Sequence, residues 1–207
     1  MYSMIGSSIV LAVFSVLYCW RRYNPRYLRS FPVFTLVNMI ENLLAWFVRT
    51  LIAPAENIYT LFEMVYFCYF LGTMMASKRS RYIMGVFALV YTGGYLFFLI
   101  RGNVLRATGF LVIVEAFLLC IGCLLYFREL MLDPAGVDLS RNPGFWMTTG
   151  TIFYFAISIP AIFLDVWYSY KGHRDYGTAI WSINNYAQVI SAALYIKGMT
   201  CLKKPSS

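Results

Sequence analysis

Residues 108–127 read TGFLVIVEAFLLCIGCLLYF. This stretch carries one charged residue, Glu115, and it has the length of about 20 residues that an α-helix needs to cross the hydrocarbon core of a bilayer. Six further stretches have a similar length and character. The sequence therefore predicts seven transmembrane helices, at residues 4–20, 31–52, 58–76, 82–100, 108–127, 145–164 and 177–197.

The composition of the whole chain agrees with this prediction. Apolar residues make up 60% and charged residues 13% of the 207 residues, against roughly 45–50% and about 25% in soluble domains. A soluble fold of this size has too much surface for so few charges. Composition therefore excludes a soluble enzyme, a disordered tail, a disulfide scaffold and a nucleic-acid-binding domain. We expect one all-α, seven-helix transmembrane domain over residues 1–207, in contact with the lipid bilayer.

The distribution of lysine and arginine predicts the orientation of this bundle. Twelve of these residues fall in the loops after the odd-numbered spans and four in the loops after the even-numbered spans. Because basic residues are enriched on the cytoplasmic side, we expect the N-terminus outside and the C-terminus inside.

The first apolar run ends in Arg21-Arg22 without a small-residue cleavage site, so we expect it to stay as a membrane anchor.

A weak internal repeat is a further feature of the sequence. Spans one to three and five to seven run in the same directions, with span four as the linker. Leu17-Tyr18 followed by Arg21 echoes Leu125-Tyr126 followed by Arg128. Such 3+1+3 parallel repeats occur in transporters, with binding sites at the repeat interface. The alternative is chance similarity among helices that are all rich in leucine, phenylalanine and tyrosine.

Polar residues within the predicted spans are the main functional signal. A charge near the centre of a bilayer is costly, so it is expected to face the interior of the bundle and to have a partner there. Most of these residues fall between mid-depth and the outer half of their spans. We predict that they converge in a ligand-binding cavity that opens outward, formed by Asn38, Glu41, Asn42, Arg49, Glu63, Glu115, Asn184 and Gln188.

The alternative interpretation of the same residues is structural. Polar side chains also hold membrane helices together through hydrogen bonds, and Arg49 could neutralise one of the glutamates. Thr151, Tyr154 and Ser158 share one face of the sixth span, which also contains Pro160, a residue that interrupts the hydrogen bonding of a helix.

Several kinds of chemistry are excluded by what the sequence lacks. The single histidine, His173, rules out both a zinc site built from several histidines and an intramembrane serine–histidine pair. Lys197 lies at the cytoplasmic end of the last span, which argues against a retinal Schiff base. Cys120 and Cys123 have C-x-x-C spacing within an apolar span, where they are expected to pack as small apolar side chains. We expect no metal, no catalytic residue and no cofactor.

Four segments together resemble a set of multi-pass inner-membrane proteins of Bacteroidetes, about 200–230 residues long, that have no assigned reaction. They are residues 57–63 (NIYTLFE), 114–130 (VEA through LYFREL), 139–155 (LSRNPGFW through FYF) and 181–185 (WSINN). The resemblance implies a bacterial inner-membrane location and marks Glu63, Glu115 and Asn184 for testing. Asn185 stands where a histidine is common in that set, so the resemblance implies no histidine-based activity.

Three functions remain open at this point. The first is a non-enzymatic protein that binds a small ligand from the outer side and signals to a cytoplasmic partner through the loop at about residues 128–144. The second is a small carrier with a proton-titrating glutamate. The third is a lipid-modifying enzyme that uses Glu41, Glu63 and Glu115, since paired carboxylates can perform acid–base chemistry.

Overall fold

The computed structural model describes residues 2–19, 26–47, 52–101, 109–132, 138–171 and 177–201. Within these ranges all regular secondary structure is helical, as the sequence predicted. The helices are α1 (Tyr2–Cys19), α2 (Arg26–Phe47), α3 (Ile52–Met74), α4 (Lys78–Arg101), α5 (Gly109–Leu132), the short 3-10 helix η2 (Leu139–Arg141), α6 (Pro143–Tyr170) and α7 (Gly177–Thr200).

Each predicted span corresponds to one helix, but several predicted ends are wrong: the third span was expected to begin at residue 58 and α3 begins at Ile52, and the sixth was expected to end at 164 and α6 ends at Tyr170. The second span is wrong at both ends. That span was expected at residues 31–52, whereas α2 starts at Arg26 and ends at Phe47, and Ile52 already belongs to α3. Arg49 and Thr50 stand between the two helices, but the prediction counted them within the second span. The start was missed because the first turn of α2 carries Arg26 and Arg29, which a search for apolar residues leaves out.

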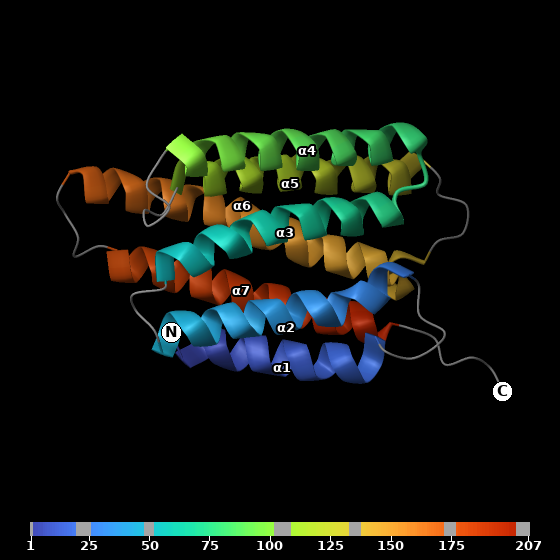
Figure 1. The fold of residues 1–207 in the computed structure, drawn as a ribbon. Coiled ribbons are helices and arrows are strands. Elements are labelled where there is room, and N and C mark those ends of the chain that lie inside the picture. The colour runs from blue at the N-terminus through green and yellow to red at the C-terminus, as the bar shows by residue number, and fades with distance from the viewer. Residues whose placement is uncertain are drawn as a thin grey trace.

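The helices alternate in direction and lie side by side (Figure 1). We call the two ends of the bundle the N end, where α1 begins, and the C end, where α7 ends. Each helix packs against its neighbours in the chain, α7 also packs against α1, and α3 also packs against α5. Six helices thus form a closed ring, and α4 lies outside it against α3 and α5 (Figure 1).

The start of α6 follows from local sequence. The side-chain oxygen of Asn142 accepts hydrogen bonds from the backbone N–H groups of Gly144 at 2.9 Å and Phe145 at 3.4 Å. Asparagine is a favoured N-cap, and proline, here Pro143, is favoured at the first helical position. The helix therefore begins two residues before the predicted sixth span.

A second cap joins three helices at the C end. The carboxylate of Glu129 near the end of α5 accepts hydrogen bonds from the backbone N–H of Ala76 at 2.8 Å and of Ser77 at 3.3 Å. These N–H groups belong to the turn between α3 and α4 and have no carbonyl partner within a helix. Glu129 therefore fixes α5 to the α3–α4 turn.

We predict that Glu129→Ala destabilises the protein by roughly 0.5–1.5 kcal/mol, the net contribution of a typical hydrogen bond, because the backbone N–H groups of Ala76 and Ser77 lose their acceptor. Thermal unfolding of the purified protein in detergent would measure this loss. Met131→Ala is the matched control, because this side chain on the same helix end is 79% exposed. Equal losses in the two variants would show that the cap contributes nothing.

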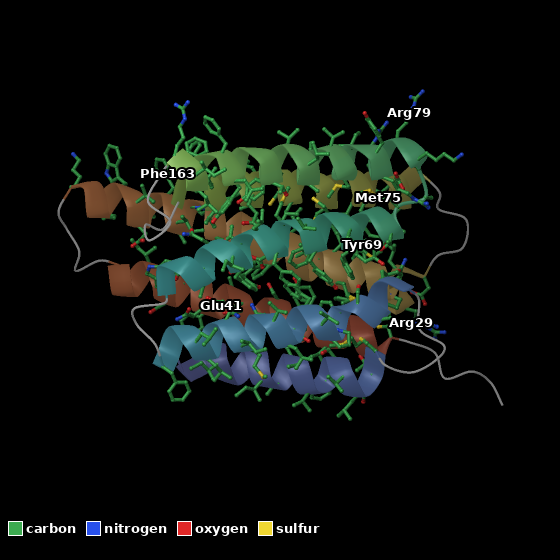
Figure 2. The ribbon with its side chains drawn as sticks, viewed as in Figure 1. Arg29, Glu41, Tyr69, Met75, Arg79 and Phe163 are labelled. Atoms are coloured by element: carbon green, nitrogen blue, oxygen red, sulfur yellow. The ribbon has the colours of Figure 1, made fainter. Side chains whose placement is uncertain are left out.

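Three of the described helices are long and apolar enough to cross a membrane, namely α4, α5 and residues 143–168 of α6. Helices α2, α3 and α7 are of comparable length, but polar residues such as Asn38, Glu63 and Gln188 lower their hydropathy. Large apolar side chains, among them Phe163, project from the outside of the bundle (Figure 2). These features are those of a membrane protein.

Candidate functional site

A cavity of about 40 Å³ lies inside the ring of helices, between α1, α2, α3, α6 and α7. Glu63 and Gln188, which face it, stand at the middle of α3 and α7 respectively. The cavity is therefore at mid-height in the bundle, at the deep end of the range from mid-depth to the outer half that the sequence suggested. Its lining consists of Ser7, Ser8, Leu11, Phe34, Asn38, Tyr59, Glu63, Phe67, Tyr154, Gln188, Ser191, Ala192 and Tyr195.

A chain of hydrogen bonds runs through five of these residues. The Tyr59 hydroxyl donates to Oε1 of Glu63 at 3.1 Å, and the Asn38 amide donates to the Tyr59 oxygen at 2.7 Å. The Ser8 hydroxyl donates to Oδ1 of Asn38 at 3.0 Å, and the Gln188 amide donates to the Ser8 oxygen at 3.4 Å. This cavity network, of Ser8, Asn38, Tyr59, Glu63 and Gln188, joins α7, α1, α2 and α3.

Helical spacing explains part of the network. Tyr59 and Glu63 are four residues apart on α3, and Asn38 and Asn42 are four apart on α2, so each pair lies on one face of its helix. The Asn42 amide donates to the backbone oxygen of Asn38 at 2.8 Å and to Ser8 at 3.3 Å. Asn42 therefore supports the network from behind without lining the cavity.

The cavity presents oxygen atoms that have no donor. Glu63 is the single carboxylate among the described lining residues, and no described group donates to its second oxygen, Oε2. The side-chain oxygen of Gln188 is also buried without a hydrogen-bond partner. No described basic side chain lines the cavity or forms an ion pair with Glu63. The arrangement is suited to a group that carries positive charge or donates hydrogen bonds.

Aromatic rings close the cavity on the side of the C end. Phe34 stacks on Tyr66 with ring centroids 4.5 Å apart and meets Phe67 at 5.0 Å. Phe31 contacts the ring of Tyr195 at 5.3 Å. We call this layer the aromatic floor, and it consists of the buried residues Phe31, Phe34, Tyr66, Phe67, Phe70 and Tyr195.

The structure brings together only part of the predicted site. Asn38, Glu63 and Gln188 line the cavity, and Asn42 contacts the network. Glu41 is half-buried on α2 and does not line the cavity. Arg49 lies outside the described residues.

Glu115 and Asn184, which we expected in the shared cavity, are not among its described lining residues. Glu115 is on α5 and interacts with Tyr91 of α4 and Cys68 of α3, on the side of α3 that faces away from α1. Asn184 accepts a hydrogen bond of 2.6 Å from Ser158, which joins α7 to α6. Neither residue belongs to the described cavity lining, but each interacts with a residue that does, Glu115 with Glu63 and Asn184 with Tyr154. A role for these two residues at the shared site stays a prediction.

Sequence reasoning also missed residues that line the cavity. Ser8 makes three contacts in the network, yet it is a short side chain within an otherwise apolar run. Tyr59, Tyr154 and Tyr195 also line the cavity and were not predicted as site residues. Tyrosine has an apolar ring and a polar tip, so composition alone does not reveal which end faces a cavity.

No group of three or more potential metal-ligating side chains occurs among the described residues. A comparison with protein-family models, curated proteins and solved structures finds no match to this chain.

Proposed function

We propose that this chain is a non-enzymatic, seven-span membrane protein that binds a small monovalent cation in the Glu63 cavity and signals this binding to a cytoplasmic partner. The observation that carries the proposal is the cavity itself. It combines one carboxylate, unpartnered oxygens and the absence of any described basic lining residue.

The distribution of charge supports the membrane orientation. The exposed basic residues of the described C end are Arg29, Lys78, Arg79, Arg81, Arg128, Arg141 and Lys197, whereas Arg101 and Lys171 lie at the N end. Figure 2 shows Arg29 and Arg79 at the same end of the bundle. By the positive-inside rule, the C end faces the cytoplasm of a bacterial inner membrane and the N end faces outward.

The volume of the cavity limits the size of the ligand. A buried water molecule needs roughly 10–15 Å³, so a cavity of about 40 Å³ holds no more than about three. Pockets for drug-sized molecules are about 300–1,000 Å³. The ligand is therefore an ion or a group of a few atoms rather than a large amphipathic molecule.

The charge of the site favours a single positive charge on the ligand. One ionised carboxylate in an apolar interior is stabilised by one compensating charge. Divalent cations need more: Ca²⁺ takes 6–8 oxygen ligands, usually with several carboxylates, and Mg²⁺ keeps several waters. The Oε2 atom of Glu63 and the unpartnered oxygen of Gln188 are suited to a sodium-sized ion or an ammonium group.

The hydrogen bonds favour signalling over passage through the protein. A cation at Oε2 of Glu63 would share the carboxylate with Tyr59, which donates to Oε1 and is linked through Asn38 and Ser8 to α2 and α1. The aromatic floor closes the route toward the C end. At that end, the exposed η2 segment contains the ion pair between Asp138 and Arg141 at 3.2 Å and offers a contact surface for a partner.

The test uses the purified protein in detergent, with sodium, potassium, ammonium and the bulky cation N-methylglucamine as probes at equal ionic strength. We expect one or more of the small cations to raise the thermal unfolding temperature in a saturable manner, and N-methylglucamine to have no effect. Equal unfolding temperatures with all four cations would contradict the proposal.

A second candidate is a small carrier, favoured by the ring arrangement. Rotation of the six-helix ring by three positions exchanges α1, α2 and α3 with α5, α6 and α7 and leaves α4 as the linker, as a 3+1+3 repeat requires. Uptake of radioactive sodium into proteoliposomes distinguishes the two candidates. Uptake that is lost in Glu63→Gln would establish the carrier, whereas stabilisation by sodium without uptake would favour the sensor.

The lipid-modifying enzyme gains no support from the geometry. Acid–base chemistry with two carboxylates requires both to face one reaction site, and among the described residues only Glu63 contributes a carboxylate to the cavity lining.

A further inference from the structure

A second carboxyl group, that of Glu115 on α5, is buried outside the cavity. Its side chain is 1% exposed, and neither of its oxygens has a hydrogen-bond partner among the described residues. It does not belong to the lining of the Glu63 cavity. A buried carboxyl group that is neither paired nor hydrogen-bonded requires an explanation of its own.

The titratable groups that interact with Glu115 come from two neighbouring helices, α3 and α4, and none of them is basic. From α3, Glu63 and Cys68 are close enough to interact with it electrostatically, and from α4 so is Tyr91. From α6, Tyr154 interacts with Glu63 rather than with Glu115. Glu115 forms no ion pair among the described residues. A negative charge on Glu115 would therefore be uncompensated, and it would also repel a charged Glu63.

The hydrogen bonding of Tyr91 suits a neutral acid at Glu115. A tyrosine hydroxyl has one proton to donate, and that of Tyr91 goes to the backbone oxygen of Leu111 at 3.2 Å. Tyr91 thus has no proton left for a carboxylate. The Tyr91 oxygen can still accept a hydrogen bond from a carboxylic acid. This would give a chain of hydrogen bonds from Glu115 through Tyr91 to Leu111.

We propose that Glu115 is a proton-binding site at the junction of α3, α4 and α5. One proton is held on its carboxyl group, and the resulting O–H donates a hydrogen bond to the Tyr91 oxygen. Glu115 does not line the Glu63 cavity, but its carboxyl group interacts electrostatically with Glu63, so a cation bound at Glu63 would ease ionisation of Glu115. Loss of the proton would leave an unpaired charge in the apolar interior. Since α4 packs mainly against α3 and α5, we expect such a charge to loosen α4.

Infrared difference spectroscopy of the purified protein at neutral pH tests the proposal, because the carbonyl band of a protonated acid is separate from carboxylate bands. Glu115→Gln should remove protonated-acid intensity, and Tyr91→Phe should shift that band without removing it. Glu129→Gln, on the same helix but with its carboxylate bonded to two backbone N–H groups, should leave the band unchanged. Loss of carboxylate intensity in Glu115→Gln would overturn the proposal.

Hydrogen–deuterium exchange of α4 gives a second, independent readout. In the wild-type protein, the backbone amides of α4 should lose protection when the pH is raised until Glu115 ionises. In Glu115→Gln, α4 should stay protected at the same pH, because the glutamine side chain remains neutral. This comparison also covers the case in which Glu115→Gln alters the infrared spectrum through misfolding, since a misfolded variant would lose protection at every pH. Equal protection profiles in the two proteins would contradict a proton site that holds α4.

Discussion

The Glu63→Gln protein should unfold at the same temperature in sodium, potassium, ammonium and N-methylglucamine, whereas the wild-type protein should be stabilised by at least one small cation. A ligand at 100 times its dissociation constant stabilises the folded state by about 2.7 kcal/mol. The substitution should remove a stabilisation of this size, measured by thermal unfolding in detergent.

The physical reason is that the substitution removes the charge and keeps the shape. Glutamine has a side-chain oxygen where Glu63 has Oε1, so it can still accept the hydrogen bond from Tyr59 that the wild-type protein shows at 3.1 Å. The helices should therefore pack as before. What disappears is the one negative charge among the described cavity lining, which is the main attraction for a cation.

Glu56→Gln is the matched control. Glu56 lies on the same helix, is half-buried and does not line the cavity, so its substitution should leave the response to small cations intact. If both variants lose the response to small cations, then removing any negative charge from α3 has this effect, and the proposed site is wrong. If neither loses it, the cation binds elsewhere.

A large loss of stability should come from Gly150→Leu in α6. A Cβ atom at Gly150 would lie 3.0 Å from a ring carbon of Tyr195 and 3.2 Å from the backbone oxygen of Ser191. The backbone oxygen of Gly150 also accepts a hydrogen bond of 2.9 Å from the Ser191 hydroxyl. Helices α6 and α7 thus approach closely at this point, as small residues permit in membrane bundles.

We expect Gly150→Leu to destabilise the protein by roughly 2–5 kcal/mol, the sum of overpacking and of a hydroxyl left without its partner. It should also abolish the cation response, since Ser191 and Tyr195 line the cavity. Gly93→Leu on α4 is the control, because nothing lies within 4 Å of a Cβ atom there. Thermal unfolding of both variants gives the comparison, and a Gly150→Leu protein as stable as Gly93→Leu would refute this contact between α6 and α7.

The helices were predictable because each contains an apolar run, and their ends were less so. Charged and capping residues such as Arg26 and Asn142 extend the helices beyond the apolar runs. The pairing of Asn38 with Asn42 was also visible, because helical spacing places both on one face. These features depend on local sequence alone.

The composition of the cavity depends instead on how each helix is rotated within the bundle, which single-sequence periodicity does not give. Glu63 and Glu115 look alike in sequence, each a lone acid in an apolar span. In the structure, Glu63 faces α1 and α2, and Glu115 faces α4. The Tyr59 hydroxyl, on the same helix as Glu63, donates a hydrogen bond to it. Ser8 was missed because a short hydroxyl side chain gives little signal until its partners on α2 and α7 are known.

The central claim is that polar side chains from separate helices enclose a cation at mid-height in the bundle. An experimental structure of the protein prepared with thallium(I), an electron-rich substitute for a monovalent cation, tests it most directly. We predict ion density between Oε2 of Glu63 and the side-chain oxygen of Gln188, with Asn38 and Tyr59 beside it. A Glu63 side chain directed at lipid, or a cavity filled by side chains with no ion density, would contradict the claim.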